Sequence, residues 1–114
     1  MRHKNKPKFG EGKDHRRKLL RSLASSIILH EKVETTASNA RAVRPYLEKL
    51  ITRSKTGTLH NRRVLLTKVT KNATAKLLEV VGPKFADKNG GYLRLTKLAA
   101  NNAPRTKVLI EFAE

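Results

Sequence analysis

Positive charge is the property that most limits what this sequence can fold into. Lys and Arg number 26 and Asp and Glu number 9, so the 114-residue chain carries a net charge of +17. A compact state with this imbalance is destabilised by its own repulsion, and a polyanionic partner relieves that repulsion most simply. The phosphates of RNA or DNA are the first candidates, and an anionic membrane surface is the second.

Features that the sequence lacks exclude several classes of protein. There is no cysteine, which excludes disulfide scaffolds, iron–sulfur clusters, cysteine-ligated zinc and thiol nucleophiles. The longest apolar-rich run, residues 19–29, is about half of the roughly 20 residues that a membrane-spanning helix needs. No apolar region of the secretory-signal type follows the basic N-terminus. We therefore expect a cytoplasmic, polyanion-binding protein that has no membrane partner.

The sequence divides into a short arm and one domain. Residues 1–14 carry five Lys or Arg, three Gly or Pro before Lys13 and one large apolar residue, Phe9, and therefore bury too little surface to fold alone. We interpret 1–14 as a basic N-terminal arm that a partner orders. Residues 15–114 are expected to form a single α/β globular domain, since 38% of the chain is hydrophobic and a small core is within reach.

Hydrophobic periodicity predicts an α+β fold. The pattern indicates helices over 14–29, 38–54, 59–69 and 73–81 and strands over 31–36, 92–98 and 107–112. The expected order is α-β-α-α-α-β-β, with the helices packed on one face of a small three-stranded sheet and the basic arm extended from it. Within the first helix the apolar stripe places Ser25 on the solvent side, and in the last strand Val108, Ile110 and Phe112 share one face.

Local signals predict where the helices begin and end. Asp14, Ser38 and Asn72 are the expected N-terminal caps. Pro45 falls within the second helix, where it removes a hydrogen bond, so we expect a kink or a late start there. Gly82-Pro83 is expected to stop the fourth helix.

The sequence contains no pattern of residues that is typical of a catalytic site. The four histidines are far apart and include no pair at metal-ligand spacing, and the nine acids do not cluster as two-metal nuclease chemistry requires. We therefore predict no enzyme activity, no cofactor, no metal site and no small-molecule substrate.

Basic residues are densest in the arm and the first helix. Positions 1–21 hold nine Lys or Arg against Glu11 and Asp14, a local net charge of +7. A solvated helix face normally mixes charges of both signs, and basic residues at a helix N-terminus oppose the helix dipole. Phosphate contact explains this placement. On the second helix Arg41, Lys49 and Arg53 lie around the polar side, and a merely solvated face explains them equally well.

Two further groups leave alternatives open. Arg62 falls among apolar residues on a helical wheel, so it either lays its stem along the core or grips phosphate together with Arg63. Tyr92 and Arg94 share one face of a predicted strand. Tyr92 either stacks on a base or, as is more common for a lone Tyr on a sheet, covers a helix or loop.

An ordered set of short motifs resembles one family, the bacterial large-subunit ribosomal protein L17. The matching pieces are Met1-Arg2-His3-Lys4, His15-Arg16 with Leu20, Leu23 and Ala24, His30-Glu31, Thr35-Thr36, residues 40–52, Arg62-Arg63, and Gly90-Gly91-Tyr92 with Arg94. The resemblance implies a structural protein of the large ribosomal subunit, located in the cytoplasmic ribosome. It further implies binding to large-subunit rRNA near the exit-tunnel side, beside neighbouring large-subunit ribosomal proteins.

The density of positive charge and the resemblance together predict which residues bind rRNA. They are Arg2, His3, Lys4, Lys6, Lys8, Lys13, His15, Arg16, Arg17, Lys18, Arg21, Arg62, Arg63, Tyr92 and Arg94. Two departures from the family matter: Phe9-Gly10-Glu11-Gly12 stands where a Leu-Gly-Arg stretch is usual, and the loop 101–106 is shorter and less basic. We carry no rRNA contacts onto that loop.

Three rival functions are consistent with the composition. A nucleoid-type or regulatory DNA-binding protein is the main alternative, but it should present a recognition helix with base-reading side chains, and the chain contains no Gln. A nuclease or RNA-modifying enzyme lacks its acid cluster. A cationic membrane-surface protein would need an apolar helix face that the core does not use, and the first helix is needed for the core.

Overall fold

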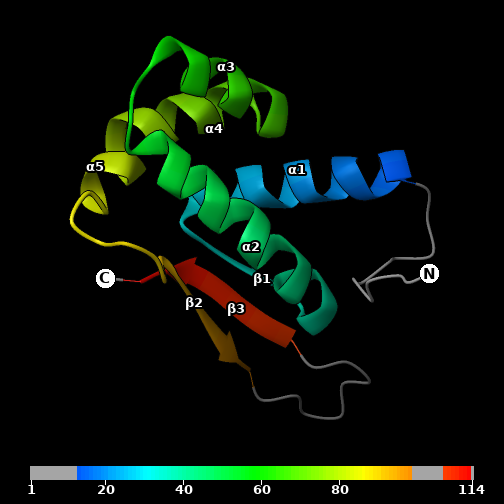
Figure 1. Cartoon of the computed structure of the whole chain (residues 1–114). Helices are drawn as coiled ribbons and strands as arrows, with labels where there is room; N and C mark the ends of the chain where they lie inside the picture. Colours follow the sequence, from blue (N-terminus) through cyan, green and yellow to red (C-terminus); the bar gives the residue numbers. More distant parts are fainter. Residues whose placement is uncertain (1–12, 99–106, 114) are drawn as a thin grey trace, which may run out of the picture.

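All the described helices lie over one side of a three-stranded sheet (Figure 1). The computed structural model describes residues 13–98 and 107–113. In chain order the elements are α1 (Lys13–His30), β1 (Lys32–Thr36), α2 (Ala37–Ser54), α3 (Leu59–Lys68), α4 (Lys71–Lys76), the π-helical turn η1 (Leu77–Val81), α5 (Gly82–Lys84), β2 (Leu93–Lys97) and β3 (Lys107–Phe112). The predicted α+β class and element order are confirmed, with the fourth helix divided into α4, η1 and α5.

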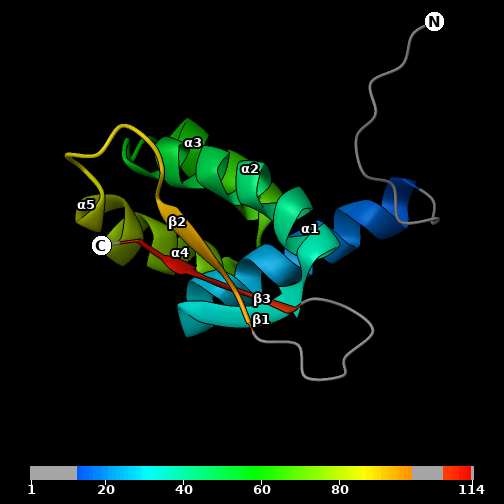
Figure 2. The same cartoon turned by 90° about the horizontal axis from the view of Figure 1, so that it is seen from below.

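The sheet is antiparallel and has the order β1-β3-β2. In β3 the alternating residues Val108, Ile110 and Phe112 are buried, as predicted, while Lys107 is exposed. Seen from below, the strands lie in front of the helices, which cover the other face (Figure 2). The helical face of the sheet therefore closes the core, and its opposite face carries polar side chains such as Glu34.

The core is built mainly by α1 and α2 together with the central strand. Ile27 and Ile28 of α1 and Val43, Leu47 and Ile51 of α2 are fully buried. Burying one such side chain stabilises the fold by about 1.5–3 kcal/mol. The helical periodicity that predicted these stripes is confirmed, and the same packing fixes the distance between the two helices.

Three helices begin at a threonine cap, and the caps predicted at Ser38 and Asn72 are wrong. Thr36 caps α2 in place of Ser38, Thr70 caps α4 in place of Asn72, and Thr58 caps α3. Each of these threonines has an extended backbone, and its hydroxyl accepts a hydrogen bond from the N–H three residues later. An N-cap needs that extended conformation. Thr36 has it already because it is the last residue of β1.

The first helix differs from its prediction at two positions. It includes Lys13 and Asp14, so Asp14 lies in the first turn and is not the residue before the helix. Ser25, expected on the solvent side, is buried. Its hydroxyl donates to the Arg21 carbonyl at 2.8 Å and accepts from the Thr70 N–H at 3.0 Å, which ties α1 to the start of α4.

Neither proline ends its helix. The helix α2 begins at Ala37 and runs without interruption past Pro45, so a late start is wrong. Gly82-Pro83, the predicted stop, is also passed: η1 widens the helix, the Gly82 N–H donates to the Leu77 carbonyl, and α5 continues to Lys84. Pro83 lies at the N-terminal end of α5, a position at which a helix tolerates a residue without an N–H.

Gly82 also allows the closest approach between α5 and the end of α2. A Cβ atom placed there would lie 2.7 Å from the Ser54 carbonyl oxygen, which is shorter than van der Waals contact. We therefore expect Gly82→Ala to lower the free energy of unfolding by about 1–3 kcal/mol, as overpacking does. Gly57→Ala is the matched control, because a Cβ at Gly57 meets nothing within 4 Å. Urea titration measures both, and equal midpoints for the two variants would contradict the close approach.

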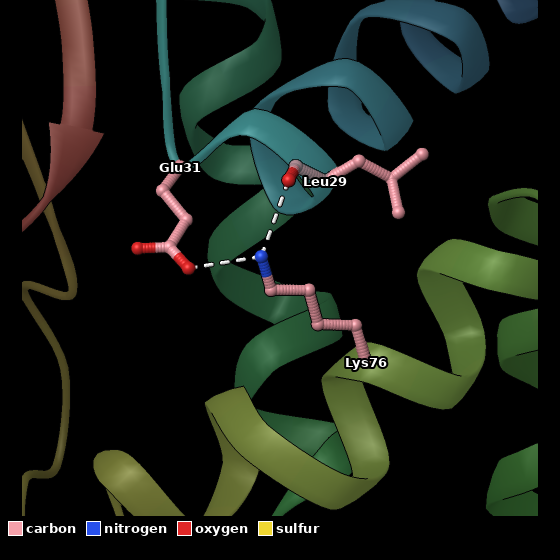
Figure 3. A network of polar contacts seen from close by, with 3 residues as sticks. All are labelled: Leu29, Glu31 and Lys76. Atoms are coloured by element: carbon pink, nitrogen blue, oxygen red, sulfur yellow. Dashed lines mark hydrogen bonds and ion pairs between the residues drawn. The ribbon is translucent and has the colours of Figure 1, made fainter.

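The end of α1 is held by a residue from α4. Glu31 follows the helix with a positive φ of 69°, and its N–H donates to the Ile27 carbonyl at 2.7 Å, a common way to end a helix. The Lys76 ammonium donates to the Leu29 carbonyl at 3.2 Å and pairs with the Glu31 carboxylate at 2.9 Å (Figure 3). The hydrogen bond and charge of Lys76 hold the pKa of Glu31 below its ordinary value of 4.5.

This pair predicts a pH-dependent contribution to stability. Because the pKa of Glu31 is lowered in the folded state, its contribution is present above about pH 4.5 and disappears as the pH falls through the lowered folded-state value. Wild type should therefore melt above Glu31→Gln at neutral pH, and the two melting temperatures should converge in acid. A difference that stays constant from pH 7 to the acid range would show that the charge of Glu31 does not contribute.

Candidate nucleic-acid interface

Six of the predicted rRNA-binding residues lie on α1. Lys13, His15, Arg17, Lys18 and Arg21 are exposed, and Arg16 is half-buried. The remaining residues predicted in the arm are Arg2, His3, Lys4, Lys6 and Lys8, and they lie outside the described residues. The α1 residues are therefore the part of the predicted site whose surroundings the structure gives.

Two adjoining hollows run between α1, α2 and α3, and we call them together the cationic groove. They have volumes of about 560 and 340 Å³ and share Tyr46 and Lys68. Eight basic residues line them: Arg16, Arg17, Lys18, Arg21, Arg41, Lys49, Arg53 and Lys68. No carboxylate is among the lining residues. Basic residues from three helices thus line these two adjoining hollows.

Internal hydrogen bonds fix the walls of the groove. The Tyr46 hydroxyl donates to the Lys68 carbonyl at 2.5 Å, which links α2 to the end of α3. Arg53 donates to the Asn61 side-chain oxygen at 3.0 Å, and Arg21 donates to the Val69 carbonyl at 3.4 Å. Burial raises the pKa of Tyr46 above its ordinary value of 10.0, against the opposing charge of Arg21, so the hydroxyl stays a donor at neutral pH.

The ion pairs of the described residues lie elsewhere. They join Arg44 to Glu48, Lys76 to Glu31 and Arg94 to Glu111, and none includes a groove residue. Within residues 13–98 and 107–113 the charges of the groove are therefore left without carboxylate partners. Such a surface repels itself in the free protein and attracts a polyanion over a long range.

Comparison with known proteins decides the family. The family model described as ribosomal protein L17 matches residues 19–113, most of the chain. The chain belongs to the ribosomal protein L17 family. It is also 46% identical, over 99 residues and 85% of its own length, to a protein named large ribosomal subunit protein bL17 from Acidobacterium capsulatum. It spans 62% of the length of that relative.

Membership in the L17 family confirms the resemblance that the sequence motifs suggested. Within the described part of the chain no cluster of three or more metal-ligating side chains occurs. The helices in that part also lack the length and apolar character needed to cross a membrane.

On the second helix of this L17 protein the structure shows groove-lining residues that the sequence left undecided. Arg41, Lys49 and Arg53, equally consistent with a solvated face, meet Arg16 in the groove, and Lys68 of α3 was not nominated at all. A signal was present, because Arg41, Lys49 and Arg53 recur at multiples of four residues and so share one side of α2. What the sequence could not give is that α1 and α3 border that side.

Arg62 and Arg63 do not join the groove. Both are exposed on α3 and line neither hollow. The helical wheel assumed that all apolar residues of this helix face inward, yet Leu59 is 63% exposed and Leu66 is 37% exposed. Arg62 is therefore an exposed residue on a helix that also exposes two leucines.

Tyr92 is buried and its ring is not available to a base. Its ring packs against Phe85 at 5.2 Å, and its hydroxyl lies 3.1 Å from the Thr52 hydroxyl. Burial raises the pKa of Tyr92, but hydrogen bonds to Lys55 and Thr52 and the charge of Lys55 outweigh it, so the net pKa is lowered. The strand begins only at Leu93, so Tyr92 is outside the alternation that placed it beside Arg94. The alternative in which Tyr92 stacks on a base is therefore wrong, and its ring packs inside the protein.

Arg94 is exposed on the open face of the sheet. It pairs with Glu111 at 3.6 Å across β2 and β3, and the helices lie on the other side of the sheet. The structure therefore separates Arg94 from the cationic groove, and its predicted contact with rRNA would require a second surface.

Substitutions of groove cations and of core residues should differ in their effect on the free energy of unfolding. Replacing both Arg16 and Lys49 by Ala should leave the free energy of unfolding within about 0.5 kcal/mol of wild type or raise it, because repulsion falls. Ile27→Ala should lower it by about 2–5 kcal/mol, because Ile27 is fully buried. Chemical denaturation measures both, and an equal loss in the two variants would show that the groove side chains support the core.

Proposed function

We propose that this L17 protein is a structural component of the large ribosomal subunit that binds large-subunit rRNA phosphates in the cationic groove. The observation that carries the proposal is the meeting of eight basic side chains from three helices in a space lined by no carboxylate. Phosphates bound there would receive guanidinium contacts, which suit their geometry, and would relieve the repulsion of the free protein.

The basic arm extends the same role. The arm and α1 are adjacent in the chain, and their shared charge density supports a path of RNA contacts from Arg2 to Arg21. Residues 1–14 are proposed as the arm, the last two of which, Lys13 and Asp14, form the start of α1, and 15–114 as the single domain. Folding of such an arm onto RNA is a common use of basic segments.

The location and partners are proposed from the family. The named relative is a large ribosomal subunit protein, which supports an assignment to that subunit. A position near the exit-tunnel side, beside neighbouring ribosomal proteins, is proposed because the sequence resemblance implies it. This proposal includes a cytoplasmic location within the ribosome. A DNA-binding protein would carry the same positive charge, but the family assignment gives no support to DNA as the partner.

Salt dependence of rRNA binding tests the groove. Each phosphate contact contributes about 0.7–0.9 to the slope of log affinity against log salt, so the double variant Arg16→Ala and Lys49→Ala should bind more weakly with a slope lower by about 1.4–1.8. Lys32→Ala with Lys107→Ala is the matched control, because it removes the same charge from the sheet and should keep the slope. Filter binding to large-subunit rRNA measures both. Identical slopes in the two double variants would overturn the groove as the phosphate site.

A further inference from the structure

The outer side of α3 carries leucines that the core does not use. Leu59 is 63% exposed and Leu66 is 37% exposed, although both are large apolar side chains. The opposite side of the helix faces the rest of the protein, since Leu65 is fully buried and the Asn61 side chain accepts a hydrogen bond from Arg53 of α2. In Figure 1 α3 lies at the edge of the helical layer, on the side away from the sheet. The two leucines therefore belong to the outer surface of the molecule.

Two arginines lie on the same side of α3 as the leucines. Residues three, four and seven positions apart share one side of a helix, so four exposed residues form one stripe, which we call the α3 stripe: Leu59, Arg62, Arg63 and Leu66. Neither arginine belongs to an ion pair of the described residues, and α3 contains no acidic residue. The α3 stripe thus combines apolar surface with positive charge that lacks a carboxylate partner within residues 13–98 and 107–113.

The α3 stripe differs from the cationic groove in the partner that would satisfy it. Phosphate satisfies a guanidinium group, but a leucine gains only when its surface leaves water for apolar surroundings. Arg62 and Arg63 line neither hollow of the groove, whereas Leu66 lines the smaller one, so the stripe adjoins the groove without being part of it. A second copy of the chain would bring like charges together. A protein surface that carries both apolar side chains and carboxylates satisfies the whole stripe.

We propose that the α3 stripe docks an amphipathic helix of a neighbouring protein in the large ribosomal subunit, and that this helix carries Asp or Glu between apolar residues. The two leucines are seven residues apart, about 10 Å along the helix axis, which is two turns of a partner helix. Apolar residues of the partner pack against Leu59 and Leu66, and its carboxylates pair with Arg62 and Arg63, whose planar guanidinium groups suit them.

The small area of the α3 stripe sets the conditions under which it binds. One face of a ten-residue helix buries less surface than a stable complex of two free proteins needs. Binding of both proteins to the same rRNA raises their effective concentration, so a weak contact forms within the subunit. The inference therefore rests on the proposed function, and its test uses assembled subunits.

Site-specific photo-cross-linking in large ribosomal subunits tests what covers the α3 stripe. A benzoylphenylalanine side chain at the position of Leu59 keeps the stripe apolar and, on irradiation, forms a bond with C–H groups that lie against it. Subunits that contain the full chain should give a protein–protein product whose added mass withstands ribonuclease. Mass spectrometry should show that the partner peptide carries Asp or Glu beside apolar residues. The same side chain at Val80, which is 51% exposed on η1, is the matched control and should not give this product.

Removal of the two arginine charges tests the carboxylates of the partner. Arg62→Gln with Arg63→Gln should lower the yield of the cross-linked product about fivefold or more, the change expected for energetically important interface residues. The double variant should keep the urea midpoint and the rRNA salt slope of wild type, because both side chains are exposed and line neither hollow. Lys32→Gln with Lys107→Gln removes the same charge from the sheet and should keep the yield.

Several results would overturn the docking helix and leave the proposed function standing. They are a product whose added mass ribonuclease removes, a cross-link to a second copy of the chain, no product at all, and a yield that does not depend on the two arginines. A salt slope lowered by about 1.4–1.8 in the arginine double variant would assign these residues to phosphate and would also overturn it. If the wild-type chain does not enter large subunits, the proposed function fails and the docking helix fails with it.

Discussion

The packing of α1 against α2 is the contact on which both the fold and the groove depend. Ile27 and Ile28 from one helix and Val43 and Leu47 from the other are fully buried, and burial of each contributes about 1.5–3 kcal/mol. The same packing holds Arg16 opposite the bases of α2. Like charges on neighbouring helices would otherwise push the helices apart, so the apolar faces beneath the groove set the spacing at which phosphate can be bound.

The distribution of ion pairs separates the charge that stabilises the fold from the charge available to a partner. The three pairs of the described residues lie within α2, at the end of α1 and on the open face of the sheet. The groove has cations from three helices and no lining carboxylate. In the free protein the like charges of the groove repel one another. Phosphate bound there would be attracted to the same charges and would relieve that repulsion.

The helical period and the strand alternation of apolar residues predicted the fold, because each helix and each strand buries one face. The stripe of α1 and the alternation of Val108, Ile110 and Phe112 are visible in the sequence, and both are confirmed. Local end signals were less informative, since a cap depends on the backbone that precedes it. Thr36 caps α2 because the chain leaves β1 in an extended conformation, and Gly82 lies inside a helix at a position where a Cβ would meet the Ser54 carbonyl oxygen.

The site could be predicted only in part for a related reason. Charge density identified α1, which stands out within the sequence itself. The basic residues of α2 do not stand out in the sequence. Only tertiary packing, which brings another helix next to them, makes Arg41, Lys49 and Arg53 part of the groove. Tyr92 shows the reverse error: its sequence neighbours suggested an accessible strand residue, while the ring fills the space beside Phe85.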